Sequence, residues 1–176
     1  MIIPNNTDSF LCPMNQAALL AELMDHAHAF TLHHVERLKG KDLHQRFSVG
    51  NIELNSPFWI LAHLAVSENW LVLRGTGGPF QKFSWAKQFT LGAPPPSPAE
   101  CPSIDEVMGT YAHVHSLALE HVRGLSDEAL ESPHLALMDL DSGSDMKAVI
   151  KHHIRHESSH NGHLGWLCKL HGLPTI

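Results

Sequence analysis

The segment KHHIRHESSHNGHLGWL, residues 151–167, carries five histidines in seventeen positions, in a chain of 176 residues that has 16 histidines in all. His156 and His160 are four positions apart, and side chains at that interval stack on one face of a helix. Apolar residues recur along the same face: Met146, Val149, Ile150, Leu164 and Leu167. The segment therefore predicts a helix over residues 144–170 that turns two imidazoles toward a buried interior.

Three other segments show the three-and-four spacing of apolar residues that is typical of amphipathic helices. They cover residues 14–39, 55–75 and 103–124. The expected buried faces are Leu20, Leu23, Ala27, Phe30, His34 and Leu38 in the first; Trp59, His63, Val66 and Trp70 in the second; and Ile104, Val107, Tyr111, Val114, Ala118, His121 and Leu125 in the third. Four helices of this kind predict an all-α protein.

Residues with capping side chains mark the starts of the second and third helices. Asn55 or Ser56 can accept a hydrogen bond from the free N–H groups of a first turn, and Pro57 suits the first helical position. Ser103 and Glu106 have the spacing of a capping box. These residues predict where both helices begin.

Residues 76–102, between the second and third helices, show no clear periodicity. Connections of this length are uncommon in compact domains and are often functional. This one is long enough to let the helices on either side run parallel. Aromatic residues in its first half are expected to anchor it against the helices: Phe80, Phe83, Trp85 and Phe89. The sequence thus predicts a four-helix bundle with a long crossover between its second and third helices.

Composition and charge argue against several classes of protein. The formal net charge is −6 with neutral histidines, which leaves no basic surface for nucleic acid or for an anionic membrane. No apolar run approaches the ~20 residues of a membrane span, and the N-terminal residues lack the pattern of a signal peptide. Cys12, Cys101 and Cys168 form neither a disulfide framework nor a metal-binding pair, so we expect a reducing cytoplasm.

Two imidazoles inside a bundle need partners, because an unpaired buried polar group costs about 1–3 kcal/mol. His63 is a third candidate, since it lies between Trp59 and Val66 on the apolar face of the second helix. Three neutral imidazoles from two helices would hold Zn²⁺, Ni²⁺ or Fe²⁺ and leave open positions for water and substrate. Hydrogen-bonded core histidines without a metal remain an alternative at this point.

Several other residues have weaker claims on such a site. Four further histidines could hydrogen-bond a ligand or substrate: His34, His121, His153 and His163. Glu68 and Glu157 project away from the expected ligands, which favours a solvated or supporting role. Cys168 has no basic neighbour in the pattern and is expected to be a packing residue rather than a nucleophile.

Two segments, NSPFWILAHLAVSENWL at residues 55–71 and HESSHNGHLGWLCKLHG at residues 156–172, resemble the second-helix and last-helix signatures of DinB-like proteins. The order of the segments, the long second connection and the chain length agree as well. The resemblance implies a single domain over residues 1–176, folded as an up-down-down-up four-helix bundle with a divalent-metal site. The metal ligands that it implies are His63, His156 and His160. One departure is a histidine, His163, where the family usually has a glutamine that supplies a hydrogen bond.

The resemblance also implies a metal-dependent activity on a small molecule, commonly in homodimers. Members of the family include transferases and isomerases that use a low-molecular-weight thiol, and others are regarded as metal-dependent hydrolases. A metal-bound thiol would be held as thiolate, and a metal-bound water would have its pKa lowered toward ~7, so either would be a nucleophile at neutral pH. Two other classes stay open: a non-catalytic bundle that uses metal for stability or sensing, with His153 or His34 as a fourth ligand, and a metal-free interaction module.

Overall fold

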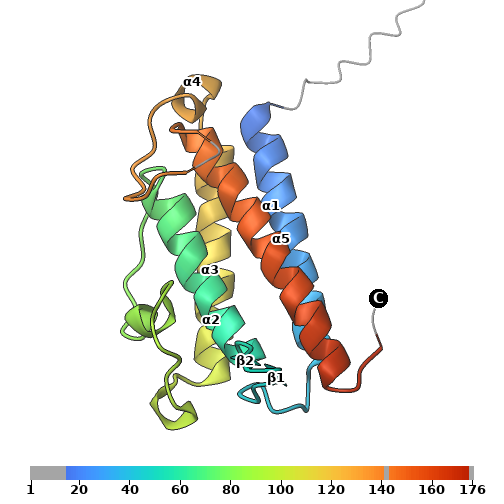
Figure 1. Ribbon diagram of the computed structural model, residues 1–176. Helices are drawn as coiled ribbons and strands as arrows, with labels where there is room; N and C mark the ends of the chain where they lie inside the picture. The colour runs from blue at the N-terminus through green and yellow to red at the C-terminus, as the bar shows by residue number, and fades with distance from the viewer. Residues whose placement is uncertain (1–14, 141–142, 175–176) are drawn as a thin grey trace, which may run out of the picture.

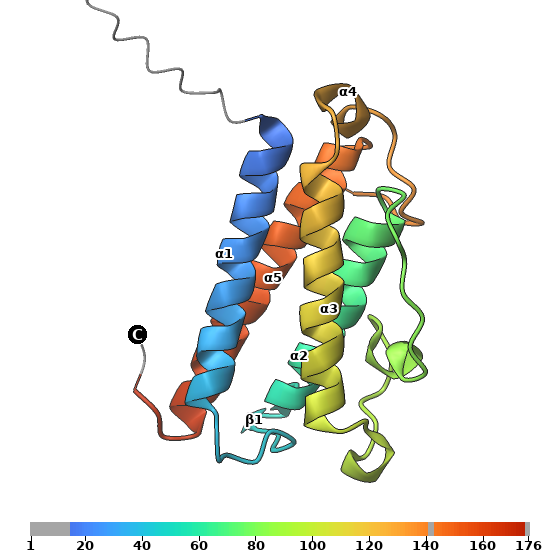
Figure 2. The same cartoon turned by 180° about the vertical axis from the view of Figure 1, so that it is seen from behind.

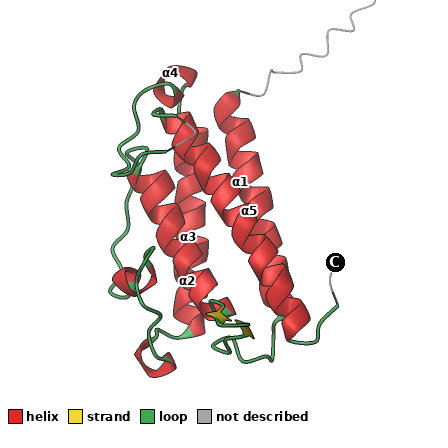
Figure 3. Ribbon diagram, in the orientation of Figure 1, coloured by secondary structure: helices red, strands yellow, loops and turns green. Residues whose placement is uncertain are grey.

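The computed structural model describes residues 15–140 and 143–174, and its long elements are all helices (Figure 1, Figure 3). The long helices are α1 (Gln16–Arg37), α2 (Pro57–Glu68), α3 (Ile104–Arg123) and α5 (Met146–Leu170). The shorter elements are α4 (Asp127–Leu130), a π-helix (Asn69–Arg74) that continues α2, two 3₁₀ turns (Ala86–Phe89 and Pro98–Glu100), and the two-residue strands β1 (Ser48–Val49) and β2 (Ile52–Glu53). The all-α prediction is confirmed.

The four long helices lie side by side in both views of the ribbon (Figure 1, Figure 2). The antiparallel hairpin of β1 and β2 precedes α2 and lies at the end of the bundle where α2 begins. The connection between α2 and α3 passes along the outside of the bundle, from the end near α4 to the opposite end (Figure 1). Two positions used in the sequence predictions, Cys12 and Met14, lie outside the described residues.

The helix starts follow from side chains that accept hydrogen bonds from the first turn. Ser56 Oγ accepts from the Trp59 N–H at 3.2 Å, and Ser103 Oγ accepts from the Glu106 N–H at 3.2 Å, as predicted. The carboxylate of Glu106 has a different partner from the one a capping box requires, because its Oε1 accepts from the indole N–H of Trp85 at 3.0 Å. That bond ties the long connection to α3.

α2 is surrounded by the rest of the bundle, and this position decides where its polar residues can go. Every residue from Pro57 to Val66 is buried, as expected for a helix that is apolar on all sides. The predicted stripe was correct for Trp59 and His63 but wrong for Trp70, which is 38% exposed. Because α2 has no solvent-exposed face along residues 57–66, its polar side chains there must lie in the protein interior.

The predicted interior face of α1 was partly wrong. Leu23 and Phe30 are 43% and 45% exposed. The buried residues lie on a neighbouring face: Ala17, Leu20, Ala21, Met24, Ala27, His28, Thr31 and His34. That face includes polar residues because α1 meets a polar region of α5, where Thr31 Oγ1 lies 2.9 Å from both Glu157 Oε1 and Asn161 Oδ1.

The long connection is anchored by its aromatic residues, as predicted. Trp85 and Phe89 are buried, and their rings lie 5.7 Å apart and nearly perpendicular, while Phe80 and Phe83 are partly buried. Fixing Phe89 also fixes its carbonyl group, which points at α2. In the part of the chain that the structure describes, no helix is long and apolar enough to cross a membrane.

We expect Gly75→Ala to destabilise the fold. Gly75 ends the π-helix, and a Cβ atom there would overlap the carbonyl oxygen of Leu71 and press on a side-chain methyl of Val149 at 3.3 Å. Forcing extra volume into a packed position typically costs about 1–3 kcal/mol. Urea unfolding of the variant should show this loss, whereas Gly109→Ala, at a helical glycine with open space, should not lose stability.

Candidate metal centre

Three histidines from two helices converge on one point. His63 comes from α2, and His156 and His160 come from successive turns of α5. One ring nitrogen of each lies within 4.8 Å of the other two, so the group could hold a metal ion. His63 Nε2 and His156 Nε2 lie 3.2 Å apart. The structure therefore brings together the three residues that the sequence predicted as ligands.

His63 is held in the orientation and protonation that a ligand requires. Its Nδ1–H donates to the carbonyl oxygen of Phe89 at 2.7 Å, so the lone pair of a neutral ring is on Nε2, which faces the other two histidines. Trp59, one turn earlier, stacks on the ring with centroids 4.6 Å apart and planes 14° apart. The position of His63 thus depends on α2 and on the long connection together.

The three imidazoles are neutral at physiological pH. Burial and the neighbouring His160 and His63 lower the pKa of His156 to about 2. Burial and His63 lower the pKa of His160 to about 4, and burial lowers the pKa of His63. Only neutral imidazole can coordinate a metal. The site therefore keeps its lone pairs available well below the pH at which an ordinary histidine takes up a proton.

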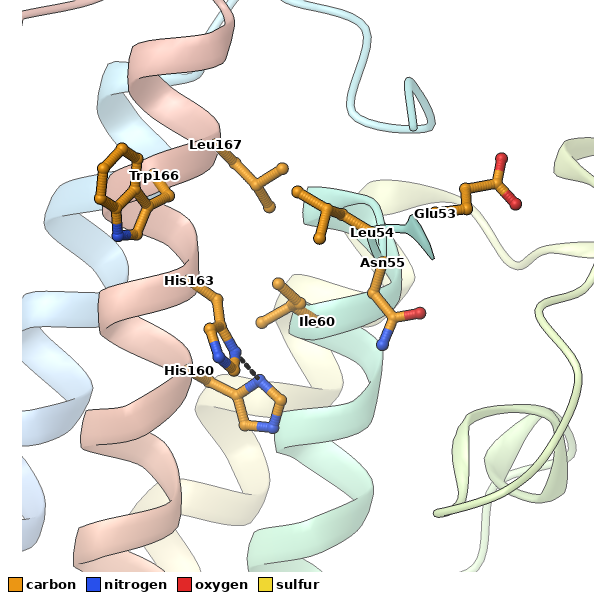
Figure 4. A pocket seen from close by; sticks show the side chains of 8 residues that line it. All are labelled: Glu53, Leu54, Asn55, Ile60, His160, His163, Trp166 and Leu167. Carbon is orange, nitrogen blue, oxygen red and sulfur yellow. Dashed lines mark hydrogen bonds between the residues drawn. The ribbon is translucent and has the colours of Figure 1, made fainter. Parts of the chain in front are cut away.

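Two cavities border the three-histidine cluster. The larger, of about 550 Å³, includes His63 and His156, and its walls are mainly apolar: Val66, Trp70, Leu71, Leu91, Ala136, Leu137 and Met138. The smaller, of about 330 Å³, includes His160 and lies beside the hairpin (Figure 4). The apolar side chains of Leu54, Ile60 and Leu167 line it together with Asn55, His163 and Trp166, while the carboxylate of Glu53 points away from His160 (Figure 4). The cluster is thus reached from two sides, each of them mainly apolar.

Of the four weaker histidine candidates, only His163 contacts the cluster. Its Nδ1 lies 3.4 Å from Nδ1 of His160 on the next turn of α5. His34 packs against Phe30 with ring centroids 4.8 Å apart, and Nε2 of His121 lies 2.8 Å from Oγ1 of Thr76. His34 and His121 therefore have partners away from the three-histidine cluster.

A second group of buried polar side chains lies deeper in the bundle, and the helix patterns of the sequence contain little sign of it. We call it the core polar cluster: His28, Glu68, His115, His153 and Glu157, none more than 5% exposed. His115 Nδ1 donates to Glu68 Oε1 at 2.8 Å, and His153 Nε2 lies 3.4 Å from Glu157 Oε2. Of the two roles expected for Glu68 and Glu157, the solvated one is wrong, because both side chains are fully buried. The sequence feature that could have predicted the burial of Glu68 is the apolar character of α2, which indicates a helix that is buried on all sides.

The charges in the core polar cluster depend on one another. Burial alone would raise the pKa of Glu68, but its interactions with His115 and His153 hold it at about 2. Burial lowers the pKa of His115, and Glu68 more than compensates, so the net change is upward. Burial raises the pKa of Glu157, which accepts a hydrogen bond from the Tyr111 hydroxyl. Glu68 is therefore the most strongly acidic group of the cluster.

Comparison with known proteins identifies the family to which the chain belongs. Among curated proteins, no match to the chain was found. A family model described as the DinB superfamily matches residues 23–164, which include all three histidines of the candidate metal centre. Because the match extends over most of the sequence, the chain belongs to the DinB superfamily.

Proposed function

We propose that the protein is a divalent-metal-dependent enzyme in which His63, His156 and His160 hold the ion. The observation that carries this proposal is the convergence of three neutral imidazoles, with Nε2 of His63 presented by the bond from its Nδ1–H to Phe89. Three nitrogen ligands suit Zn²⁺, Ni²⁺ or Fe²⁺ and leave coordination positions for other molecules. When bound, such an ion lowers the pKa of a coordinated water or thiol and so supplies a nucleophile.

A structural or sensing role for the metal has less support. It calls for a fourth protein ligand that closes the coordination shell, and His153 and His34 were the candidates. His153 faces Glu68 and Glu157, while His34 packs against Phe30. A metal-free interaction module remains the last alternative, and a chelator that leaves the melting temperature unchanged would favour it.

Of the two reactions that a three-histidine site supports, we favour transfer of a small thiol over hydrolysis. Transfer needs room for two molecules, and the cluster has a cavity on each side. The smaller cavity offers Asn55 and His163 as polar partners for the polar groups of a low-molecular-weight thiol. The larger cavity suits an apolar electrophile. The thiolate sulfur would form a bond to the electrophilic atom as the leaving group departs with the electron pair.

The test of this function compares two assays on protein loaded with Zn²⁺, Ni²⁺ or Fe²⁺. In the first, loss of free thiol is followed for small thiols with an aryl halide as electrophile. In the second, hydrolysis of apolar esters and amides is followed without thiol. Metal-dependent thiol consumption supports transfer. Metal-dependent hydrolysis without thiol supports the second candidate, and no turnover in either assay counts against an enzyme.

Leu137→Asp should weaken binding of an apolar substrate by about 5- to 10-fold, equivalent to roughly 1 kcal/mol of lost apolar contact. Leu137 lines the larger cavity yet is 82% exposed, so its replacement does not disturb the core. The Michaelis constant or the dissociation constant of the electrophile reports the effect. Leu170→Asp, at the far end of α5 and 42% exposed, is the control and should leave both unchanged.

We also propose the finer architecture that the family suggests: one domain, an up-down-down-up order of helices, and a homodimer in a reducing cytoplasm. The outer path of the connection between α2 and α3 supports the order of helices (Figure 1). Exposed Leu19, Leu23 and Phe30 on α1 supply an apolar face that a second copy could cover, and free Cys101 and Cys168 suit a reducing compartment. Light scattering after size-exclusion chromatography measures the oligomeric state.

A further inference from the structure

We propose that the bundle core contains a second divalent-metal site, formed by His28 of α1, Glu68 of α2 and His115 of α3. It shares no residue with the three-histidine cluster and goes beyond the proposed function. The ligands would be two imidazole nitrogens and one carboxylate oxygen, a set that suits Zn²⁺, Fe²⁺ or Mn²⁺.

The geometry of these three residues fits one ion. One ligand atom of each lies within 4.8 Å of the other two, and all three residues are buried. The rings of His28 and His115 are stacked, with centroids 3.7 Å apart and planes 3° apart, so their in-plane lone pairs run parallel and one ring must turn before both can meet one ion. Ligands at about 2.0–2.2 Å from a tetrahedral ion lie roughly 3.3–3.6 Å from one another. Rotation of one of the two histidine rings, together with small shifts of the other ligands, would therefore be needed to complete the site.

Asp25 gives His115 the orientation of a metal ligand. Oδ1 of Asp25 lies 3.3 Å from Nε2 of His115, and the carboxylate, which only accepts, fixes the proton on that nitrogen. Nδ1 of His115 then faces Glu68 at 2.8 Å and can present a lone pair when an ion replaces the shared proton. A carboxylate behind the distal nitrogen is the usual support for a metal-bound histidine.

Unpaired atoms in the same place are the second, independent sign of a ligand. Nδ1 of His28 and Oε2 of Glu68 are buried and have no hydrogen-bond partner within residues 15–140 and 143–174. Near them, Nδ1 of His153 also lacks such a partner, whereas Nε2 of His153 lies 3.4 Å from Oε2 of Glu157. Each unpaired buried group costs about 1–3 kcal/mol. An ion between His28, Glu68 and His115 would pair the first two atoms directly.

The negative charge nearby favours a cation. Glu157 lies in the same core, with Oε1 3.9 Å from Nδ1 of His28, and Glu68 carries the charge of a direct ligand. The rival explanation is a closed network in which protons on His115 and His153 balance these carboxylates and no ion binds. Zinc stoichiometry separates the two.

The experiment counts zinc in protein purified without a nickel column, stripped with chelator, refolded with Zn²⁺ and desalted. We expect two zinc ions per wild-type chain and one in a chain that combines His63→Ala with His156→Ala. Adding Glu68→Gln to that background should remove the last ion. Asp25→Asn should weaken zinc binding to that background by about 10- to 100-fold, as the loss of a supporting carboxylate does. Glu22→Gln, on the exposed side of the same helix, is the matched control and should change nothing.

A folded His63→Ala, His156→Ala protein without zinc would overturn the second site. So would a remaining ion whose affinity is unchanged by both Glu68→Gln and Asp25→Asn. If Glu68→Gln fails to fold, Asp25→Asn decides, because the Asp25 side chain is 56% exposed and its loss leaves the core intact. Failure of the three-histidine cluster would look different: wild type and the His63→Ala, His156→Ala chain would then hold the same number of ions.

Discussion

His156→Ala should weaken metal binding at the three-histidine cluster by more than about 100-fold, beyond the 10- to 100-fold that loss of a merely supporting partner costs. His156 supplies Nε2 at 3.2 Å from Nε2 of His63, so its removal leaves two ligands instead of three. Metal-dependent turnover should fall to background. Metal competition with a chromophoric chelator measures the affinity directly.

The fold should survive this substitution, because His156 is neutral and its Nδ1 has no hydrogen-bond partner in the described part of the chain. A metal at 100 times its dissociation constant stabilises the folded state by about 2.7 kcal/mol. The variant should lose this stabilisation, and added metal should therefore no longer raise its melting temperature. His113→Ala, at an exposed histidine of α3, is the control for unspecific binding by a histidine-rich chain. Full metal affinity in His156→Ala would contradict the assignment of this ligand.

Local patterns indicated His156 and His160 and made His63 a third candidate, while the complete ligand set came from the resemblance to DinB-like proteins. The four-residue interval between His156 and His160 fixes a common helix face, and the apolar neighbours of His63 fix the burial of α2. Both depend on residues close in sequence. The capping residues Ser56 and Ser103 were predictable for the same reason, since each bonds within its own helix.

The core polar cluster could not be predicted in this way, because its bonds join helices that are distant in sequence. Asp25 of α1 contacts His115 of α3, and His115 in turn forms a hydrogen bond with Glu68 of α2. A single helix pattern treats Glu157 as polar and therefore outward, although α1 and α3 cover it with Thr31 and Tyr111. The predicted buried face of α1 was partly wrong for the same reason, because polar residues such as Thr31 are buried against α5.

The bond between His63 and Phe89 shows a further limit of the sequence. Phe89 contributes a carbonyl oxygen, which any residue at that position would offer. What brings it to α2 is the packing of the long connection through the buried side chains of Trp85 and Phe89. Aromatic residues predicted the anchoring of this segment, but not which backbone group would orient the metal ligand.

Glu68→Gln should cost metal-free protein about 3 kcal/mol of stability at pH 6. Gln keeps the shape and can still accept from His115, so the change isolates the charge. The pKa of Glu68 is lowered from 4.5 to about 2 in the folded protein, and a tenfold change in acid strength corresponds to about 1.4 kcal/mol. Leaving one partner of a buried ion pair alone costs a similar amount, about 3–5 kcal/mol. Urea unfolding with chelator present measures the loss.

The pH dependence of this loss identifies the carboxylate as its cause. A carboxyl group whose pKa is lower in the folded state stabilises the fold fully above its unfolded pKa of 4.5, and the gain disappears as the pH falls toward about 2. The stability difference between wild type and Glu68→Gln should therefore shrink between pH 4 and pH 3. Glu120→Gln, at an exposed position of α3, should show no such difference at any of these values. A difference that does not shrink between pH 4 and pH 3 would mean that Glu68 is not the charged partner of His115 and His153, and that the core is held together by neutral hydrogen bonds instead.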